Sequence, residues 1–134
     1  MGSARFVLLV DDDREICEII TAVLALEGFA VKAASDVAQG LELADDDTAL
    51  VLLDLRLPGL SPAEFVRRYR QCKGVAAAPI IAFSASSRIV EFATSIGADG
   101  ILRKPFELQD LIDLVSRHLR PASRSDRRVL SYAP

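Results

Sequence analysis

The chain has 134 residues, of which 51% are hydrophobic and 26% are charged, and its formal net charge is −3. This length fits one ordinary domain, and the composition excludes collagen, a coiled coil and a chain that is disordered throughout. No apolar run approaches the roughly 20 residues that cross a bilayer, so we expect no membrane contact. The cysteines Cys17 and Cys72 are too few for a disulfide scaffold, and we expect a cytoplasmic protein.

The charge is distributed unevenly along the chain. The first 50 residues hold 11 acids against 3 bases, whereas the remaining residues carry a net positive charge. This mild overall balance does not favour nucleic-acid binding by the domain. The early excess of acids suggests instead a local acidic site where a cation could bind.

In chain order, the first predicted strand is the continuous apolar run of residues 6–10. Helical spacing of apolar residues follows it, at Ile16, Ile19, Ile20, Val23 and Leu24. Gly28 is expected to end this helix in a left-handed conformation. The next predicted elements are a strand at residues 30–34, a helix with Val37, Leu41 and Ala44, and a strand at residues 49–53.

A helix start is signalled by Ser61 as N-cap, Pro62 at the first helical position and Glu64 at the third, the pattern of a capping box. The elements predicted from here on are a third helix with Phe65, Val66 and Tyr69 on its inner face, a strand at residues 80–83, a fourth helix with Ile89, Phe92, Ala93 and Ile96 closed by Gly97, a strand at residues 100–103, and a fifth helix with Leu108, Leu111, Ile112, Val115 and Leu119.

Five apolar strands that alternate with five helices predict an α/β fold. We expect a doubly wound, five-stranded parallel sheet of flavodoxin-like order 2-1-3-4-5, with helices on both faces. The domain should span residues 4–120. Residues 121–134 lose all periodicity, so they are predicted to be a flexible C-terminal tail or a truncated linker.

Polar residues follow four neighbouring strands of this predicted sheet. They are Asp11-Asp12-Asp13 after the first strand, Asp54 after the third, Ser84 after the fourth and Lys104 after the fifth. Ligands of such folds bind beyond the carboxyl ends of the strands, so these groups should share one cleft. Clustered carboxylates repel one another, and Mg²⁺ relieves that repulsion while binding phosphate oxygens. A buried Asp54 could act as a metal ligand or as a nucleophile toward a phosphoryl group.

Each of these signals is weak by itself. An acidic run is usually a solvated loop or a helix cap, and Asp13 in particular fits the N-cap of the first helix. A single Asp, Ser or Lys after a strand is equally common in turns. Their joint occurrence at four neighbouring strand ends, in this order, is what predicts a functional site.

The chain resembles a response-regulator receiver domain, the phosphoacceptor half of bacterial two-component signalling. The resemblance lies in residues 7–12, 53–59, 79–85 and 97–106. It implies Asp54 as the phosphorylated residue, and Mg²⁺ bound by Asp11, Asp12, Asp54 and the backbone carbonyl of Arg56. It further implies that the hydroxyl of Ser84 contacts the phosphoryl oxygens, that Lys104 pairs with them, and that Pro105 follows a cis peptide bond.

Two departures from the family concern its output. Receiver domains often carry an aromatic switch residue three positions before the lysine, where this chain has Ile101. The segment from Ser84 to Gly97 is also shorter than the family pattern. We therefore expect Ser84, rather than Ile101, to lead any conformational switch.

The resemblance implies a signalling switch that accepts a phosphoryl group from a histidine kinase or a histidine phosphotransfer protein. Such a switch catalyses only its own phosphorylation and dephosphorylation. It would act on a downstream effector through its fourth helix, fifth strand and fifth helix, as a monomer or weak homodimer.

Two other classes of function fit the sequence less well. An Mg²⁺-dependent phosphohydrolase with an aspartyl-phosphate intermediate commonly has a second acid two positions after the nucleophile, where this chain has Arg56. A nucleotide or flavin binder would need a GxxxxGK[ST] or GxGxxG loop after the first strand, and none follows it.

Overall fold

The computed structural model of the chain describes residues 5–57, 59–73 and 78–119. Its strands are β1 (Phe6–Val10), β2 (Ala30–Ala34), β3 (Thr48–Asp54), β4 (Ile80–Ser84) and β5 (Gly100–Arg103). Its helices are α1 (Arg14–Leu26), α2 (Val37–Leu43), α3 (Pro62–Lys73), α4 (Ile89–Ile96) and α5 (Leu108–Leu119). The predicted C-terminal tail, residues 121–134, lies outside the described residues.

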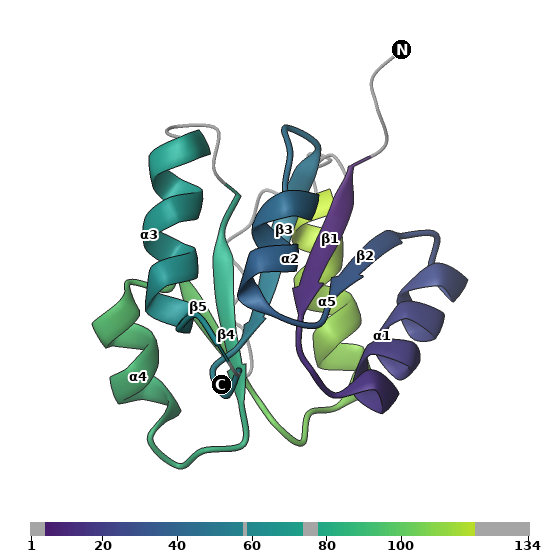
Figure 1. Cartoon of the computed structure of the whole chain (residues 1–134). Coiled ribbons are helices and arrows are strands. Elements are labelled where there is room, and N and C mark those ends of the chain that lie inside the picture. Colours follow the sequence, from purple (N-terminus) through teal and green to yellow (C-terminus); the bar gives the residue numbers. More distant parts are fainter. Residues whose placement is uncertain (1–4, 58, 74–77, 120–134) are drawn as a thin grey trace.

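The five strands form one parallel sheet in the order β2-β1-β3-β4-β5, which confirms the predicted doubly wound fold (Figure 1). Two strands extend further than the apolar runs indicated. Pairing of Asp54 with Phe83, and of Ser84 with Arg103, makes Asp54 and Ser84 the last residues of their strands. Their side chains are therefore held by the sheet itself and not by a loop.

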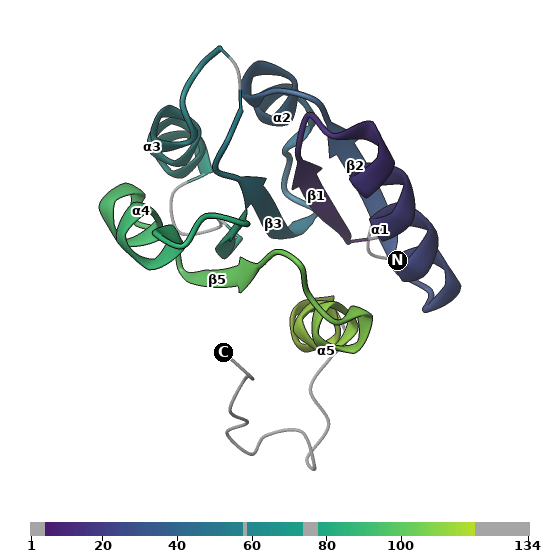
Figure 2. The ribbon, with the colours of Figure 1, turned by 90° about the horizontal axis from the view of Figure 1, so that it is seen from below.

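Helices cover both faces of the sheet, as Figure 2 shows from below. Along β1, Phe6, Leu8 and Val10 face the core that contains α2 and α3, whereas Val7 and Leu9 face the core of α1 and α5. This alternation follows from the two-residue period of a strand. Fully buried strands of this kind read as continuous apolar runs in the sequence.

The predicted helix ends are found with one difference. Gly28 and Gly97 have φ angles of 87° and 76°, in the left-handed region that favours glycine. At the start of α3, Ser61 Oγ accepts a hydrogen bond from the amide of Glu64. The return bond of a capping box is replaced, because the Glu64 carboxylate pairs with Arg67 and Arg68.

Three residues of the apolar helical stripes in the sequence are exposed to solvent. Ile19, Phe92 and Leu108 are 50%, 41% and 46% exposed. Ile19 and Phe92 lie at one margin of their apolar stripes, and Leu108 is the first residue of α5. The ring of Phe92 instead lies 5.2 Å from the guanidinium carbon of Arg88.

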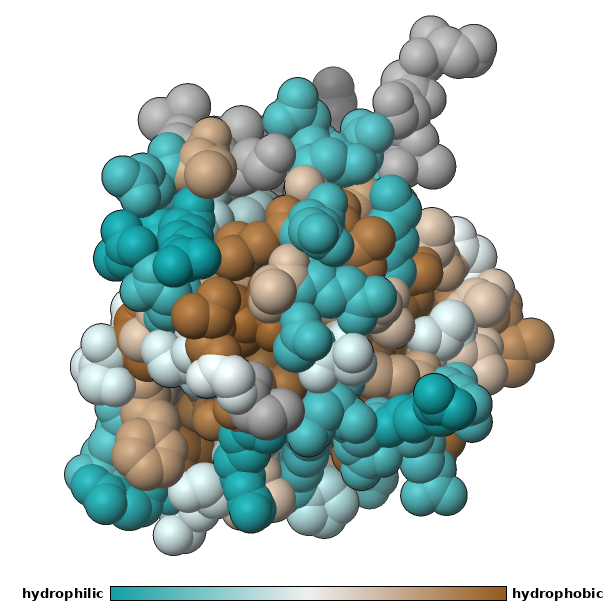
Figure 3. Space-filling view, viewed as in Figure 1, coloured by the Kyte–Doolittle hydropathy of each residue, from teal (hydrophilic) through white to brown (hydrophobic). Residues whose placement is uncertain are grey.

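On the face shown in Figure 3, hydrophobic side chains appear between α3 and α2, while hydrophilic side chains cover the outer side of α3. Within the described part of the chain, every helix is too short or too polar to cross a membrane.

Candidate functional site

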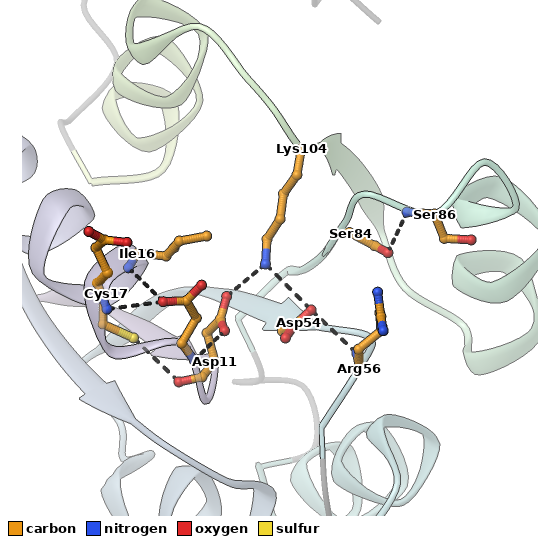
Figure 4. Close-up of polar contacts among 10 residues, drawn as sticks. Asp11, Ile16, Cys17, Asp54, Arg56, Ser84, Ser86 and Lys104 are labelled. Carbon is orange, nitrogen blue, oxygen red and sulfur yellow. Dashed lines mark hydrogen bonds and ion pairs between the residues drawn. The ribbon is translucent and has the colours of Figure 1, made fainter.

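The candidate site lies at the carboxyl edge of the sheet, at the bottom of Figure 1 and facing the viewer in Figure 2. The ends of β1, β3, β4 and β5 meet there because the strands are parallel and adjacent. The side chains of Asp11, Asp54, Ser84 and Lys104, predicted to share one cleft, gather at this edge (Figure 4). Asp11, Asp54 and Ser84 are each at most 4% exposed, so the polar groups of the site are built into the core.

Asp11 and Asp54 are the two buried acids of the site. Asp11 Oδ1 accepts a hydrogen bond from the amide of Asp13 at 2.9 Å, and Asp54 Oδ1 accepts one from the amide of Arg56 at 3.3 Å. Asp12 is exposed at the rim. One carboxylate oxygen from each of Asp11, Asp12 and Asp54 lies within 4.8 Å of the others.

Asp13 takes the structural role that the sequence allowed for it. Its carboxylate accepts hydrogen bonds from the amides of Glu15 and Ile16 and caps α1. This cap accounts for the third acid of the run without any role in the site.

Lys104 supplies the positive charge of the site. Its Nζ lies 3.0 Å from Asp11 Oδ2 and 3.7 Å from Asp54 Oδ1, and its side chain is only 17% exposed. The amide of Lys104 donates to the carbonyl of Ser84 at 2.9 Å, which fixes the base of the side chain. The Lys104–Pro105 peptide bond is cis, as the family resemblance implied.

The negative charge of the site exceeds what one ammonium neutralises. Burial, followed by the charge of Asp11, raises the pKa of Asp54 from 3.8 to about 6, although Lys104 and the amide of Arg56 act in the opposite direction. Burial, followed by the charges of Asp11, Asp13 and Asp12, raises the pKa of the Cys17 thiol to about 11, against the opposing charge of Lys104. The thiol is therefore protonated at neutral pH, and its Sγ donates to the carbonyl of Asp11 at 3.4 Å.

These residues fit a divalent cation of the Mg²⁺ type. The three carboxylates offer oxygen ligands, which Mg²⁺ prefers, and the raised pKa of Asp54 marks charge that a cation would neutralise. The backbone of Arg56 turns toward Asp54 through its amide. A role of the Arg56 carbonyl as a further ligand stays a prediction.

Ser84 connects the site to α4. Its buried Oγ accepts a hydrogen bond from the amide of Ser86 at 3.0 Å, and Ser86 Oγ accepts one from the amide of Arg88 at 3.0 Å. Because Ser84 Oγ acts as acceptor in this contact, its proton is available to a further acceptor, such as a phosphoryl oxygen. Arg88 directly precedes α4, so two consecutive side-chain hydrogen bonds lead from the site to that helix.

Phe83 also belongs to this site, although sequence reasoning treated it only as a strand residue. Lys104 Nζ lies 4.4 Å from the centroid of the Phe83 ring. Within the sheet, Phe83 pairs with Asp54 on one side and Leu102 on the other. The register of the strands places the Phe83 ring beside Asp54. The position of the Lys104 ammonium over that ring depends in addition on the conformation of the turn after β5.

The sequence profile described as "Response regulator receiver domain" matches residues 7–116 of the chain. The transcriptional regulatory protein CpxR of Escherichia coli is 33% identical over 124 residues, which are 91% of this chain and 52% of that protein. The DNA-binding response regulator MtrA of Mycolicibacterium paratuberculosis is 36% identical over 133 residues, which are 95% of this chain and 56% of that protein. The chain thus spans about half the length of these curated relatives.

Solved structures show the same similarity. The chemotaxis protein CheY4 of Vibrio cholerae superposes with a TM-score of 0.75 at 27% identity, covering 87% of this chain and 100% of that one. The receiver domain of NtrX from Brucella abortus superposes with a TM-score of 0.73 at 28% identity, covering 84% of this chain and 97% of that one.

Proposed function

Because the chain belongs to the response regulator receiver domain family, we propose that it is a phosphorylation-dependent switch whose phosphoacceptor is Asp54. The observation that carries this proposal is the position of the Lys104 ammonium, 3.0 Å from Asp11 and 3.7 Å from Asp54. The ammonium neutralises part of the charge around Asp54 and remains close enough to pair with a phosphoryl group attached there.

In the proposed reaction, a carboxylate oxygen of Asp54 attacks the phosphorus of a phosphohistidine. The phosphorus–nitrogen bond breaks, and the imidazole leaves with the electron pair. Lys104 and the Ser84 hydroxyl then stabilise the oxygens of the transferred group as ion-pair and hydrogen-bond donors. Mg²⁺ held by Asp11, Asp12, Asp54 and the carbonyl of Arg56 would neutralise further charge on those oxygens.

The proposed partners follow from the family. The phosphodonor would be a histidine kinase or a histidine phosphotransfer protein, and the catalysis would be limited to the domain's own phosphorylation and dephosphorylation. The effector would bind α4, β5 and α5, where Val90 and Phe92 of α4 are exposed. CpxR and MtrA are named as transcriptional and DNA-binding regulators, so an output domain of that kind is one proposed effector.

We further propose that residues 4–120 act as the receiver domain, with residues 121–134 as a tail or linker. The domain itself would not bind nucleic acid. It would act in the cytoplasm as a monomer or weak homodimer.

Incubation with acetyl phosphate and Mg²⁺, followed by intact-mass measurement, tests this function. We expect one phosphoryl group per chain, and none in Asp54→Asn, which keeps the shape of the side chain but lacks the nucleophile. The control variant is Asp46→Asn, an exposed acid between α2 and β3, which should be phosphorylated normally. Continued turnover of many equivalents of acetyl phosphate would indicate a phosphohydrolase instead. Phosphorylation of Asp54→Asn would show that the phosphoacceptor is a residue other than Asp54.

A further inference from the structure

Three groups lie close to the Lys104 ammonium. Two are the carboxylates of Asp11 and Asp54. The third is the face of the Phe83 ring, whose centroid lies 4.4 Å from Nζ. This distance is well inside the roughly 6 Å within which an aromatic ring attracts a cation.

The ring is held firmly in this place. Phe83 is fully buried within β4, between Asp54 of β3 and Leu102 of β5 in the register of the sheet. The ring of Phe106 lies against it, with centroids 5.5 Å apart and planes inclined by 41°. The orientation of the Phe83 ring is thus fixed from the strand and from the loop that follows Lys104.

A fixed aromatic face attracts a lysine ammonium in addition to packing against its side chain. The flexible Lys104 side chain has access to water, since it is 17% exposed. An aliphatic neighbour would leave the ammonium free to turn toward water, whereas the negative face of an aromatic ring attracts it toward the carboxylates. We propose that Phe83 is a positioning residue, which holds the Lys104 ammonium between Asp11 and Asp54 for phosphoryl transfer. This inference rests on the proposed function of Asp54.

Fluorination of the Phe83 ring tests the proposal with little change of shape. Fluorine withdraws electron density, so a monofluorinated, a trifluorinated and a pentafluorinated phenylalanine at position 83 attract a cation progressively less. With acetyl phosphate as donor and Mg²⁺ at saturation, we expect the rate of phosphorylation of Asp54 to fall along this series, by about fivefold for the last member. In this reaction the Asp54 oxygen bonds to phosphorus and acetate leaves with the electrons of the broken bond.

Pentafluorophenylalanine at position 65 is the matched control. Phe65 is equally buried, but it lies in the core on the opposite face of the sheet and stacks on Tyr69. Its substitution should leave the rate within twofold of the wild-type value. A rate loss of equal size at both positions would mean that fluorination acts through the core, which would overturn the proposal.

A second readout does not depend on activity. Protons of the Lys104 ε-methylene group should resonate upfield of their usual position because they lie near the ring face, and Phe83→Leu should remove that shift. An ordinary wild-type resonance would overturn the proposed contact. If the wild-type chain is phosphorylated but the rates are equal along the fluorinated series, the role of Phe83 alone is overturned. If the wild-type chain accepts no phosphoryl group, the proposed function is overturned, and the role of Phe83 with it.

Discussion

The ammonium of Lys104 and the carboxylate of Asp11 form an ion pair of 3.0 Å, although 93 residues separate them in the chain. The Asp11 side chain is fully buried in this pair, whereas that of Lys104 remains 17% exposed. Removing one partner of such a pair leaves the other charge buried and uncompensated, which destabilises the folded protein. The pair therefore connects the electrostatics of β1 to the loop after β5.

Replacing Lys104 by methionine should raise the pKa of Asp54 above its value of about 6. The reason is that the lysine charge is one of the factors that lower this pKa, against burial and the charge of Asp11, which raise it. Carbon-detected NMR titration of the Asp54 carboxyl group in metal-free buffer measures the change. Lys32→Met is the control, since Lys32 pairs with Asp45 on the surface near β2. An Asp54 pKa that stays constant or falls in Lys104→Met would contradict the position of the Lys104 charge beside Asp54.

The contribution of Asp54 to the stability of the metal-free protein should decrease as the pH rises from about 4 to about 6. Asp54 has a higher pKa in the folded protein than its ordinary value of 3.8, so the folded state holds the proton more tightly across this range. Asp54→Asn removes the buried charge and should raise the free energy of unfolding at pH 7 by about 1 to 2 kcal/mol, with little gain at pH 4. Urea unfolding at both pH values measures this difference. Asp46→Asn should show no such pH dependence. A gain in stability of Asp54→Asn that is larger at pH 4 than at pH 7 would contradict the upward shift of the Asp54 pKa.

Mg²⁺ should stabilise the wild-type chain at neutral pH by about 1 to 3 kcal/mol when it is present well above its dissociation constant. Asp12→Ala should lose this stabilisation together with phosphorylation, because Asp12 contributes one of the three clustered oxygens. Asp13→Asn should keep both, since the asparagine oxygen can still cap α1. Thermal unfolding with and without Mg²⁺ compares the three chains. Equal losses in both variants would show that the acidic pair has been assigned to the wrong residues.

Much of this site could be predicted from the sequence, because its members stand at the ends of apolar strands. A parallel sheet brings such ends together whatever the details of packing, which is why Asp11, Asp54, Ser84 and Lys104 converge as expected. The contact between Lys104 and Phe83 could not be predicted, since it depends on the conformation of the long Lys104 side chain.

Burial along the helices follows less directly from the sequence than the convergence of the strand ends. The exposure of Ile19 and Phe92 depends on how far each helix is rotated against the sheet, and apolar spacing alone does not determine that rotation. Leu108 is exposed at the first position of α5. The half-formed capping box of α3 has a similar cause. The amide of Ser61 and two nearby arginines can each donate to the Glu64 carboxylate, and in the structure the arginines do so.

Phosphorylation should act through the loop after β4 and the start of α4, without an aromatic switch on β5. Two hydrogen bonds connect the Ser84 hydroxyl through Ser86 to the amide of Arg88, where α4 begins. The segment between α4 and β5 is held at Asp99, whose carboxylate accepts hydrogen bonds from Arg70 of α3 and from the amide of Ile80. A shift of Ser84 toward a phosphoryl group should therefore loosen the first turn of α4 and leave its last turn in place.

Ile101 is not suited to follow that movement. It is half-buried on β5 opposite Ala82, and a β-branched side chain is stiff at χ1. Amide hydrogen exchange with and without Mg²⁺ and beryllium fluoride, a phosphoryl mimic, should thus change most in residues 84–92 and little at Ile101. Ser86→Ala breaks the connection and should reduce the change in α4 by at least half, whereas Ser87→Ala, at the exposed neighbouring position, should preserve it. The largest change at Ile101 would place the transmission of the signal in β5 instead, and an undiminished response in Ser86→Ala would show that the signal reaches α4 without the Ser84–Ser86–Arg88 hydrogen bonds.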